Sequence, residues 1–211
     1  MHEKGTERVK RLPQPILMLV TEPRPNLPEI VAGAVAGGVN VVLWREKAPA
    51  AGWERRAREL REAAGCTLLL VNGPLPLARA SMSDGMHLPE DGMPIAEARR
   101  SAGADALIGR SIHSIESAIR AEEEGADYVI AGTIFASLSH PELVPAGIDF
   151  LREVCTAVKI PVIAIGGVGP ENVADCLRVG AAGVAVLSPI MRATDPRIAA
   201  QAYRIAMEGR N

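Results

Sequence analysis

Short apolar segments alternate with alanine-rich amphipathic segments along nearly the whole chain, and this alternation limits the folds open to it. The first pair is ILMLV at residues 16–20, followed by PEIVAGAVAGG at residues 28–38. The apolar segments are continuous, as is typical of parallel strands that are buried on both faces. Strands that alternate with helices indicate crossover connections between parallel neighbours.

We predict eight strands and eight helices in strict alternation. The expected strands are residues 16–20, 39–45, 67–72, 84–88, 106–111, 127–133, 161–167 and 183–188. The expected helices are residues 28–38, 52–65, 74–81, 93–103, 114–125, 148–159, 170–180 and 196–209. Eight such units in about 200 residues predict the fold class α/β, a single (β/α)8 TIM barrel. A doubly wound open sheet is the alternative.

The chain has 211 residues, and its composition is even along its length. We expect residues 1–14 to form an N-terminal tail and residues 15–211 to form one barrel domain. Hydrophobic residues make up 48% of the chain but aromatic residues only 3%, so the core must consist of Ala, Val, Ile and Leu.

Charge and cysteine content exclude several classes of partner. The net charge of −2 gives no electrostatic reason to expect nucleic acid or an anionic membrane. No apolar run approaches the ~20 residues of a membrane span, and the charged N-terminus lacks the apolar region of a signal peptide. Three scattered cysteines argue against a disulfide framework or a zinc site. We therefore expect a cytoplasmic protein, and a homo-oligomer is left open.

Polar residues gather where the predicted strands end, which is where a barrel of this kind places its chemistry. The residues at these strand ends, most of them polar, are Thr21, Glu22, Arg45, Glu46, Lys47, Asn72, His87, Ser111, His113, the segment 133–147, Gly166, Gly167, Leu187 and Ser188.

The ends of the seventh and eighth strands indicate a phosphate site. Gly166 and Gly167 follow the seventh strand, and Leu187 and Ser188 close the eighth. Barrels commonly bind phosphate at these two loops through backbone N–H groups, and glycine lets the backbone come close to an anion. A tight turn alone would also explain the two glycines.

Six motifs in the expected order resemble the strand-end motifs of the thiamine phosphate synthase family. They are VVLWREK, DGMHLPED, IGRSIHS, GADYVIAGTIF, PVIAIGGVGPENV and GAAGVAVLSPI. The family includes a sister branch of TenI-like thiazole tautomerases. The resemblance implies a (β/α)8 barrel and a phosphorylated heterocycle as the ligand. The synthase branch joins a pyrimidine diphosphate to a thiazole phosphate with Mg²⁺, whereas the tautomerase branch moves a proton in a thiazole carboxylate phosphate without a metal.

Four positions depart from the synthase pattern. Leu43 stands where that branch has Gln, Gly73 and Gly92 stand where it has metal-binding Asp, and His140 stands where it has Lys. Glycine offers Mg²⁺ no side-chain oxygen. These departures favour the tautomerase branch and predict no metal or other cofactor. The stretch HLPED and the segment around His140 also look more like that branch.

A tautomerase needs a group that transfers protons near neutral pH, and histidine suits this role. The candidates are His140, in a long loop of the kind that forms lids, His113 and His87. Each has a structural alternative: an exposed loop residue for His140, a residue that orients the next helix for His113, and a packed rim residue for His87. Some tautomerases have a histidine at the position of Thr133.

Five further residues are candidates for substrate binding: Arg45, Lys47, Asn72, Ser111 and Thr133. Arg45 and Lys47 could clamp a carboxylate or a phosphate, or form ion pairs with Glu22 or Glu46. Asn72 could instead form a turn, and Ser111 could instead cap a helix.

The sequence therefore predicts a thiazole tautomerase of thiamine biosynthesis, in which a histidine moves the proton. The first alternative is a thiamine phosphate synthase that holds Mg²⁺ through Asp91, Glu90 or Glu46. The second alternative is a regulator that binds a phosphorylated ligand without turnover.

Overall fold

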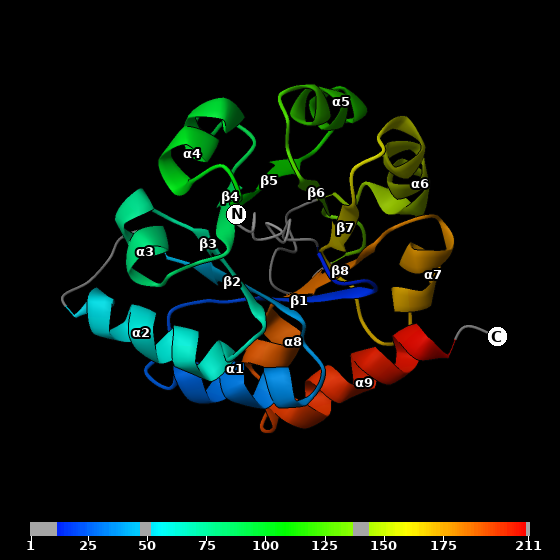
Figure 1. Ribbon diagram of the computed structural model, residues 1–211. Helices are drawn as coiled ribbons and strands as arrows, with labels where there is room; N and C mark the ends of the chain where they lie inside the picture. The colour runs from blue at the N-terminus through cyan, green and yellow to red at the C-terminus, as the bar shows by residue number, and fades with distance from the viewer. Residues whose placement is uncertain (1–11, 47–51, 137–143, 210–211) are drawn as a thin grey trace, which may run out of the picture.

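The computed structural model describes residues 12–46, 52–136 and 144–209. Eight parallel strands close into a barrel in the order β1 to β8, and β1 pairs with both β2 and β8. Figure 1 shows the helices as an outer ring around these strands. The predicted (β/α)8 barrel is confirmed, and the open sheet is wrong because both edges of the sheet are paired.

The described residues contain eight strands and nine helices. The strands are β1 Ile16–Val20, β2 Val41–Arg45, β3 Leu68–Asn72, β4 Gly85–Leu88, β5 Leu107–Ile112, β6 Tyr128–Gly132, β7 Val162–Ile165 and β8 Gly183–Val186. The helices are α1 Leu27–Ala36, α2 Trp53–Ala64, α3 Leu75–Ala80, α4 Ile95–Ala102, α5 Ile115–Glu123, α6 Gly147–Ala157, α7 Val173–Arg178, α8 Ser188–Met191 and α9 Pro196–Glu208. The short helix α8 was not predicted, because its four residues are too few to show a helical period.

Two hydrophobic clusters fill the molecule, one on each side of the strands. Ile16 and Met18 of β1 belong to the cluster inside the barrel, whereas Leu17 and Leu19 belong to the cluster between strands and helices. Successive strand side chains point to opposite faces, so both faces of each strand must be apolar. Burial of each such side chain contributes roughly 1.5–3 kcal/mol. This explains the unbroken apolar runs.

Polar side chains tie neighbouring strands together at the amino-terminal end of the barrel. The Asp127 carboxylate accepts a hydrogen bond from the backbone N–H of Ile108 at 2.7 Å and from Arg99 at 2.9 Å. The Asp84 carboxylate has the same arrangement with Leu69 N–H at 2.9 Å and Arg61 at 3.1 Å. An aspartate before one strand therefore fixes the start of the preceding strand.

Four predictions about the whole chain are addressed only in part or not at all. No helix in the described ranges is both long enough and apolar enough to cross a bilayer. The division into a tail at residues 1–14 and a barrel domain at 15–211 stays a prediction, because residues 1–11 lie outside the described ranges. The cytoplasmic location and the absence of nucleic-acid binding also stay predictions.

We expect Asp127→Ala to lower the free energy of unfolding by about 1–3 kcal/mol, since it removes a charged acceptor from the Ile108 N–H. Urea denaturation of the variant and of the parent measures this difference. Asp105→Ala is the matched control, because Asp105 is exposed on the loop before β5. Equal losses in the two variants would contradict this role of Asp127.

Candidate active site

The parallel barrel brings the carboxyl ends of its strands together at one edge. Arg45 at the end of β2 pairs in register with Asn72 at the end of β3. Ser111 lies near the end of β5 and pairs with Ile130 of β6. These predicted substrate-binding residues therefore share the mouth of the barrel, whereas Lys47 and His140 lie outside the described residues, and the predictions for them stay open.

The loop after β7 is built from glycines in the left-handed region. Gly166 has φ +94° and Gly167 has φ +61°. A Cβ atom on Gly166 would overlap Thr133, and a Cβ atom on Gly167 would overlap the Ala136 carbonyl. The loop after β7 thus packs closely on the loop after β6, and only glycine fits both the dihedral angles and the space. The turn and the packing of the two loops explain both glycines, and their predicted phosphate role stays a prediction.

Two side chains hold the same loop from outside. The Asn172 amide donates to the Gly167 carbonyl at 3.1 Å, and its oxygen accepts from Gly169 N–H at 2.9 Å. The buried Tyr203 hydroxyl on α9 donates to the Val168 carbonyl at 2.8 Å. The backbone of the predicted phosphate loop is therefore fixed before any ligand binds.

Leu187 and Ser188 do not extend β8 as predicted. The strand ends at Val186, Leu187 caps α8, and Ser188 is the first residue of this short helix. Both residues are half-buried and follow β8 directly, next to the β7 loop because β7 and β8 are paired. Their predicted phosphate role stays a prediction.

His87 is buried inside the mouth of the barrel, with 3% of its surface exposed. Its Nδ1 lies 3.2 Å from the Tyr128 hydroxyl, and its Nε2 lies 2.9 Å from Ser111 Oγ. Burial, and secondly the Arg110 charge, lower the pKa of His87 to about 3. His87 is therefore neutral at pH 7, and each of its ring nitrogens has a hydrogen-bond partner. This geometry fits the structural alternative, in which His87 is a packed residue at the rim of the barrel.

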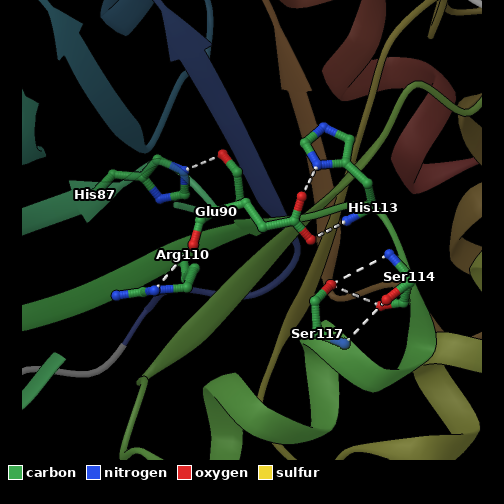
Figure 2. Close-up of polar contacts among 7 residues, drawn as sticks. His87, Glu90, Arg110, His113, Ser114 and Ser117 are labelled. Atoms are coloured by element: carbon green, nitrogen blue, oxygen red, sulfur yellow. Dashed lines mark hydrogen bonds and ion pairs between the residues drawn. The ribbon is translucent and has the colours of Figure 1, made fainter. Parts of the chain in front are cut away.

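His113 is exposed and forms a surface contact with Glu90. Its Nδ1 lies 2.6 Å from Glu90 Oε2, and its backbone N–H donates to Glu90 Oε1 at 3.2 Å (Figure 2). Burial raises the pKa of the Glu90 carboxyl, but hydrogen bonds from Ser117 and His113 outweigh burial and lower it. Ser114 and Ser117 form a capping box at the start of α5. This geometry fits the helix-orienting alternative for His113.

Sequence reasoning missed Arg110, which fixes the loop after β4. This buried guanidinium donates to the backbone carbonyl of Glu90 at 3.0 Å (Figure 2). It also donates to the backbone carbonyl of Met93 at 2.5 Å. Its charge also adds to the lowering of the His87 pKa. The only signal was a charged residue in the middle of an apolar strand.

The proposed ion pair between Arg45 and Glu22 does not form. Glu22 instead contacts Arg24 at 2.7 Å and Arg192 at 3.5 Å, and the hydrogen bond from Arg24 lowers the pKa of Glu22. Within the described ranges, no hydrogen bond or ion pair engages the half-buried Arg45 guanidinium. Arg45 is therefore available to an anionic ligand at the mouth.

The described residues do not fit a Mg²⁺ ion held by the protein. Side chains at Gly73 and Gly92 would approach backbone carbonyls, Glu46 O at 2.5 Å and Pro89 O at 2.9 Å respectively. The Glu90 carboxylate is occupied by His113 and Ser117. Among the residues that the structure describes, no three His, Cys, Asp or Glu side chains cluster as metal ligands.

A separate cavity of about 700 Å³ lies at the other end of the barrel. Its lining includes Pro15, Val162 and Ala182, which lie at the amino-terminal ends of β1, β7 and β8. Enzymes with this fold bind substrate at the carboxyl-terminal end, and the opposite end serves stability. We therefore place the candidate site at the mouth formed by Arg45, Asn72 and Ser111.

The low pKa of His87 predicts a pH-dependent stability. A histidine whose native pKa lies below its unfolded value of 6.5 contributes stability that is complete above pH 6.5 and falls as the pH decreases toward 3. We expect the free energy of unfolding to fall in this window by up to about 1.4 kcal/mol per pH unit more in the parent than in His87→Gln. Urea denaturation from pH 4 to 8 measures both slopes, and parallel slopes would contradict a buried neutral His87.

Comparisons of the sequence and of the structure with known proteins point to the same family. The family model for thiamine monophosphate synthase matches residues 17–190. A thiamine-phosphate synthase of Natronomonas pharaonis is 41% identical over 86% of this chain and 87% of that protein. One from Synechocystis sp. is 38% identical over 91% of this chain, which spans 57% of that longer protein. The solved thiamine phosphate pyrophosphorylase of Pyrococcus furiosus is 34% identical, with TM-score 0.82 over 92% of this chain and 95% of that one.

These comparisons overturn the prediction of a thiazole tautomerase. The relatives that match most of the chain at 38–41% identity are named as synthases, so they support the first alternative instead. The departures at Leu43, Gly73, Gly92 and His140 predicted the wrong branch, because these four positions are local and the agreement with synthases extends over most of the chain. The resemblance at family level is confirmed, and the chain belongs to the thiamine monophosphate synthase family.

Proposed function

We propose that this protein is a thiamine phosphate synthase, a transferase that joins a pyrimidine diphosphate to a thiazole phosphate and releases pyrophosphate. The observation that carries the proposal is the match to a relative named as a synthase over 86% of this chain and 87% of that protein. The position of Arg45, Asn72 and Ser111 at or near the carboxyl ends of β2, β3 and β5 supports it.

The chemistry of this transfer requires no proton shuttle. The lone pair of the thiazole nitrogen forms a C–N bond to the pyrimidine methylene carbon. The C–O bond to the diphosphate breaks, and its electron pair remains on the diphosphate oxygen. A neutral His87 with both nitrogens occupied is compatible with such a reaction. The reaction instead requires the site to stabilise the negative charge that develops on the diphosphate leaving group.

Arg45 and Ser111 are the described residues suited to the leaving group. The guanidinium of Arg45 is permanently charged, and it offers several N–H donors in a fork that fits phosphate oxygens. Ser111 adds a hydroxyl from the end of β5. Lys47, outside the described residues, would add a second positive charge, and Asn72 and Thr133 would contact the rings.

The phosphate of the thiazole is assigned to the loops after β7 and β8. The positive φ angles of Gly166 and Gly167 turn the backbone at the carboxyl end of β7, and Asn172 holds their loop in place. Leu187 and Ser188 follow the neighbouring strand. Because this site is mainly backbone, its shape depends on glycine rather than on charged side chains.

Mg²⁺ is implied by the synthase resemblance, but the described side chains do not match a protein-held ion. Gly73 and Gly92 supply no carboxylate. We therefore assign no step to a metal, and Mg²⁺ enters the assay as a variable.

We expect the purified protein, mixed with hydroxymethylpyrimidine diphosphate and thiazole phosphate, to form equal amounts of thiamine phosphate and pyrophosphate. Arg45→Ala should lower kcat/KM about 10- to 100-fold, since a hydrogen bond from a charged group contributes about 1.5–3 kcal/mol. Chromatographic quantification of both products, with and without Mg²⁺, measures this. Arg58→Ala on the exposed face of α2 is the matched control. Failure to form thiamine phosphate under both conditions would refute the proposed function.

A further inference from the structure

Three hydrogen-bonded side chains form a chain inside the barrel, from Tyr128 of β6 through His87 of β4 to Ser111 near the end of β5. The Tyr128 hydroxyl contacts His87 Nδ1 at 3.2 Å, and His87 Nε2 contacts Ser111 Oγ at 2.9 Å. The rings of His87 and Tyr128 stack with their centroids 5.6 Å apart. Tyr128 has no exposed surface, His87 is buried, and Ser111 at the end of the chain is partly exposed.

Gly109 makes this arrangement possible. His87 of β4, Gly109 of β5 and Tyr128 of β6 lie in register across three neighbouring strands. A Cβ atom on Gly109 would overlap the Tyr128 ring. The missing side chain in the middle strand therefore lets residues from the two outer strands meet above it.

The hydrogen bonds of the chain fix where each proton lies. Within the described ranges, the Tyr128 hydroxyl has one hydrogen-bond partner, His87 Nδ1. A buried hydroxyl whose proton has no acceptor costs about 1–3 kcal/mol, so the Tyr128 O–H donates to Nδ1. Nδ1 is then unprotonated, and the neutral ring must carry its hydrogen on Nε2.

The direction of the last bond follows from the tautomer. The Nε2–H of His87 donates to Ser111 Oγ, so the oxygen of Ser111 is used as an acceptor. Its own hydrogen is then free to point elsewhere, toward the mouth. With the opposite tautomer, Ser111 would donate to Nε2 and would present only lone pairs, which repel a phosphate oxygen.

We propose that Tyr128 and His87 are positioning residues that make the Ser111 hydroxyl a hydrogen-bond donor to a phosphate or diphosphate oxygen of the substrate. This inference rests on the proposed function for the identity of the substrate. Neither Tyr128 nor His87 touches the substrate itself. Their effect is to fix the direction of one proton.

Burial and nearby charges keep the hydrogen bonds from Tyr128 through His87 to Ser111 in one direction as the pH changes. Burial and the Arg110 charge keep His87 neutral, and burial, then the Asp127 charge, raises the pKa of Tyr128. A neutral imidazole has one N–H, so a single hydrogen-bond direction holds across the neutral range. A charged imidazole would donate at both nitrogens.

Nitrogen NMR of the histidine rings tests the tautomer directly. In protein with ¹⁵N-labelled histidine, the signals that are lost in His87→Gln identify His87. We expect the parent to carry the proton on Nε2 at pH 7, and Tyr128→Phe to shift the population toward Nδ1–H. A parent ring protonated on Nδ1 would overturn the proposal.

A double-mutant cycle on Tyr128 and Ser111 tests whether their hydrogen-bond connection through His87 affects catalysis. We expect Tyr128→Phe to lower kcat/KM about 3- to 10-fold and Ser111→Ala about 10-fold or more, while the double variant is no worse than Ser111→Ala alone. Ser81→Ala, which removes a buried hydroxyl from the end of α3, should leave kinetics unchanged. Independent, multiplicative losses from Tyr128→Phe and Ser111→Ala would overturn the proposal. Thermal unfolding of each variant shows that it is folded.

Binding of inorganic pyrophosphate separates this inference from the proposed function. If the parent makes no thiamine phosphate, the synthase proposal fails. Calorimetry with pyrophosphate alone then still tests whether the Ser111 hydroxyl donates a hydrogen bond to a phosphate oxygen. We expect the Kd to rise about 3- to 10-fold in Tyr128→Phe and not to rise further when this change is added to Ser111→Ala. An unchanged Kd in Tyr128→Phe, or no binding by the parent, would overturn the inference.

Discussion

Closure of the parallel sheet is the constraint on which the rest of this molecule depends. Since β1 pairs with both β2 and β8, no strand edge remains unpaired, and all strand ends of one kind meet at one mouth. Closure also buries both faces of each strand. The apolar core, the aspartates that link neighbouring strands at the amino-terminal end of the barrel, and the polar mouth all follow from this arrangement.

Glycine shapes the mouth by leaving out side chains. Gly166 and Gly167 let the loop after β7 lie against the loop after β6, and Gly109 leaves the space in which Tyr128 reaches His87. In each case an added Cβ atom would overlap a neighbouring residue. The same residue type thus lets two loops pack closely at one point and leaves a path for hydrogen-bonded side chains at another.

The histidines illustrate how far a motif can be interpreted without coordinates. The side chain type and its place after a strand suggested proton transfer, but His87 is buried and neutral, and His113 is held by Glu90 at the surface. Desolvation and the Arg110 charge arise from residues that are distant in the sequence. The prediction of the tautomerase branch was wrong for a related reason, because the missing carboxylates at Gly73 and Gly92 are local features, whereas the similarity to synthases covers most of the barrel.

The sequence by itself determined the alternation of strands and helices, the family, and the set of polar strand ends, because burial of both strand faces leaves a direct mark on the order of apolar residues. It did not show helix α8, the Arg110 contacts or the chain from Tyr128 to Ser111. Only the tertiary structure decided these, because they depend on register between strands and on the space beside Gly109. Register sets which side chains meet across neighbouring strands, and a single chain's local pattern does not contain it.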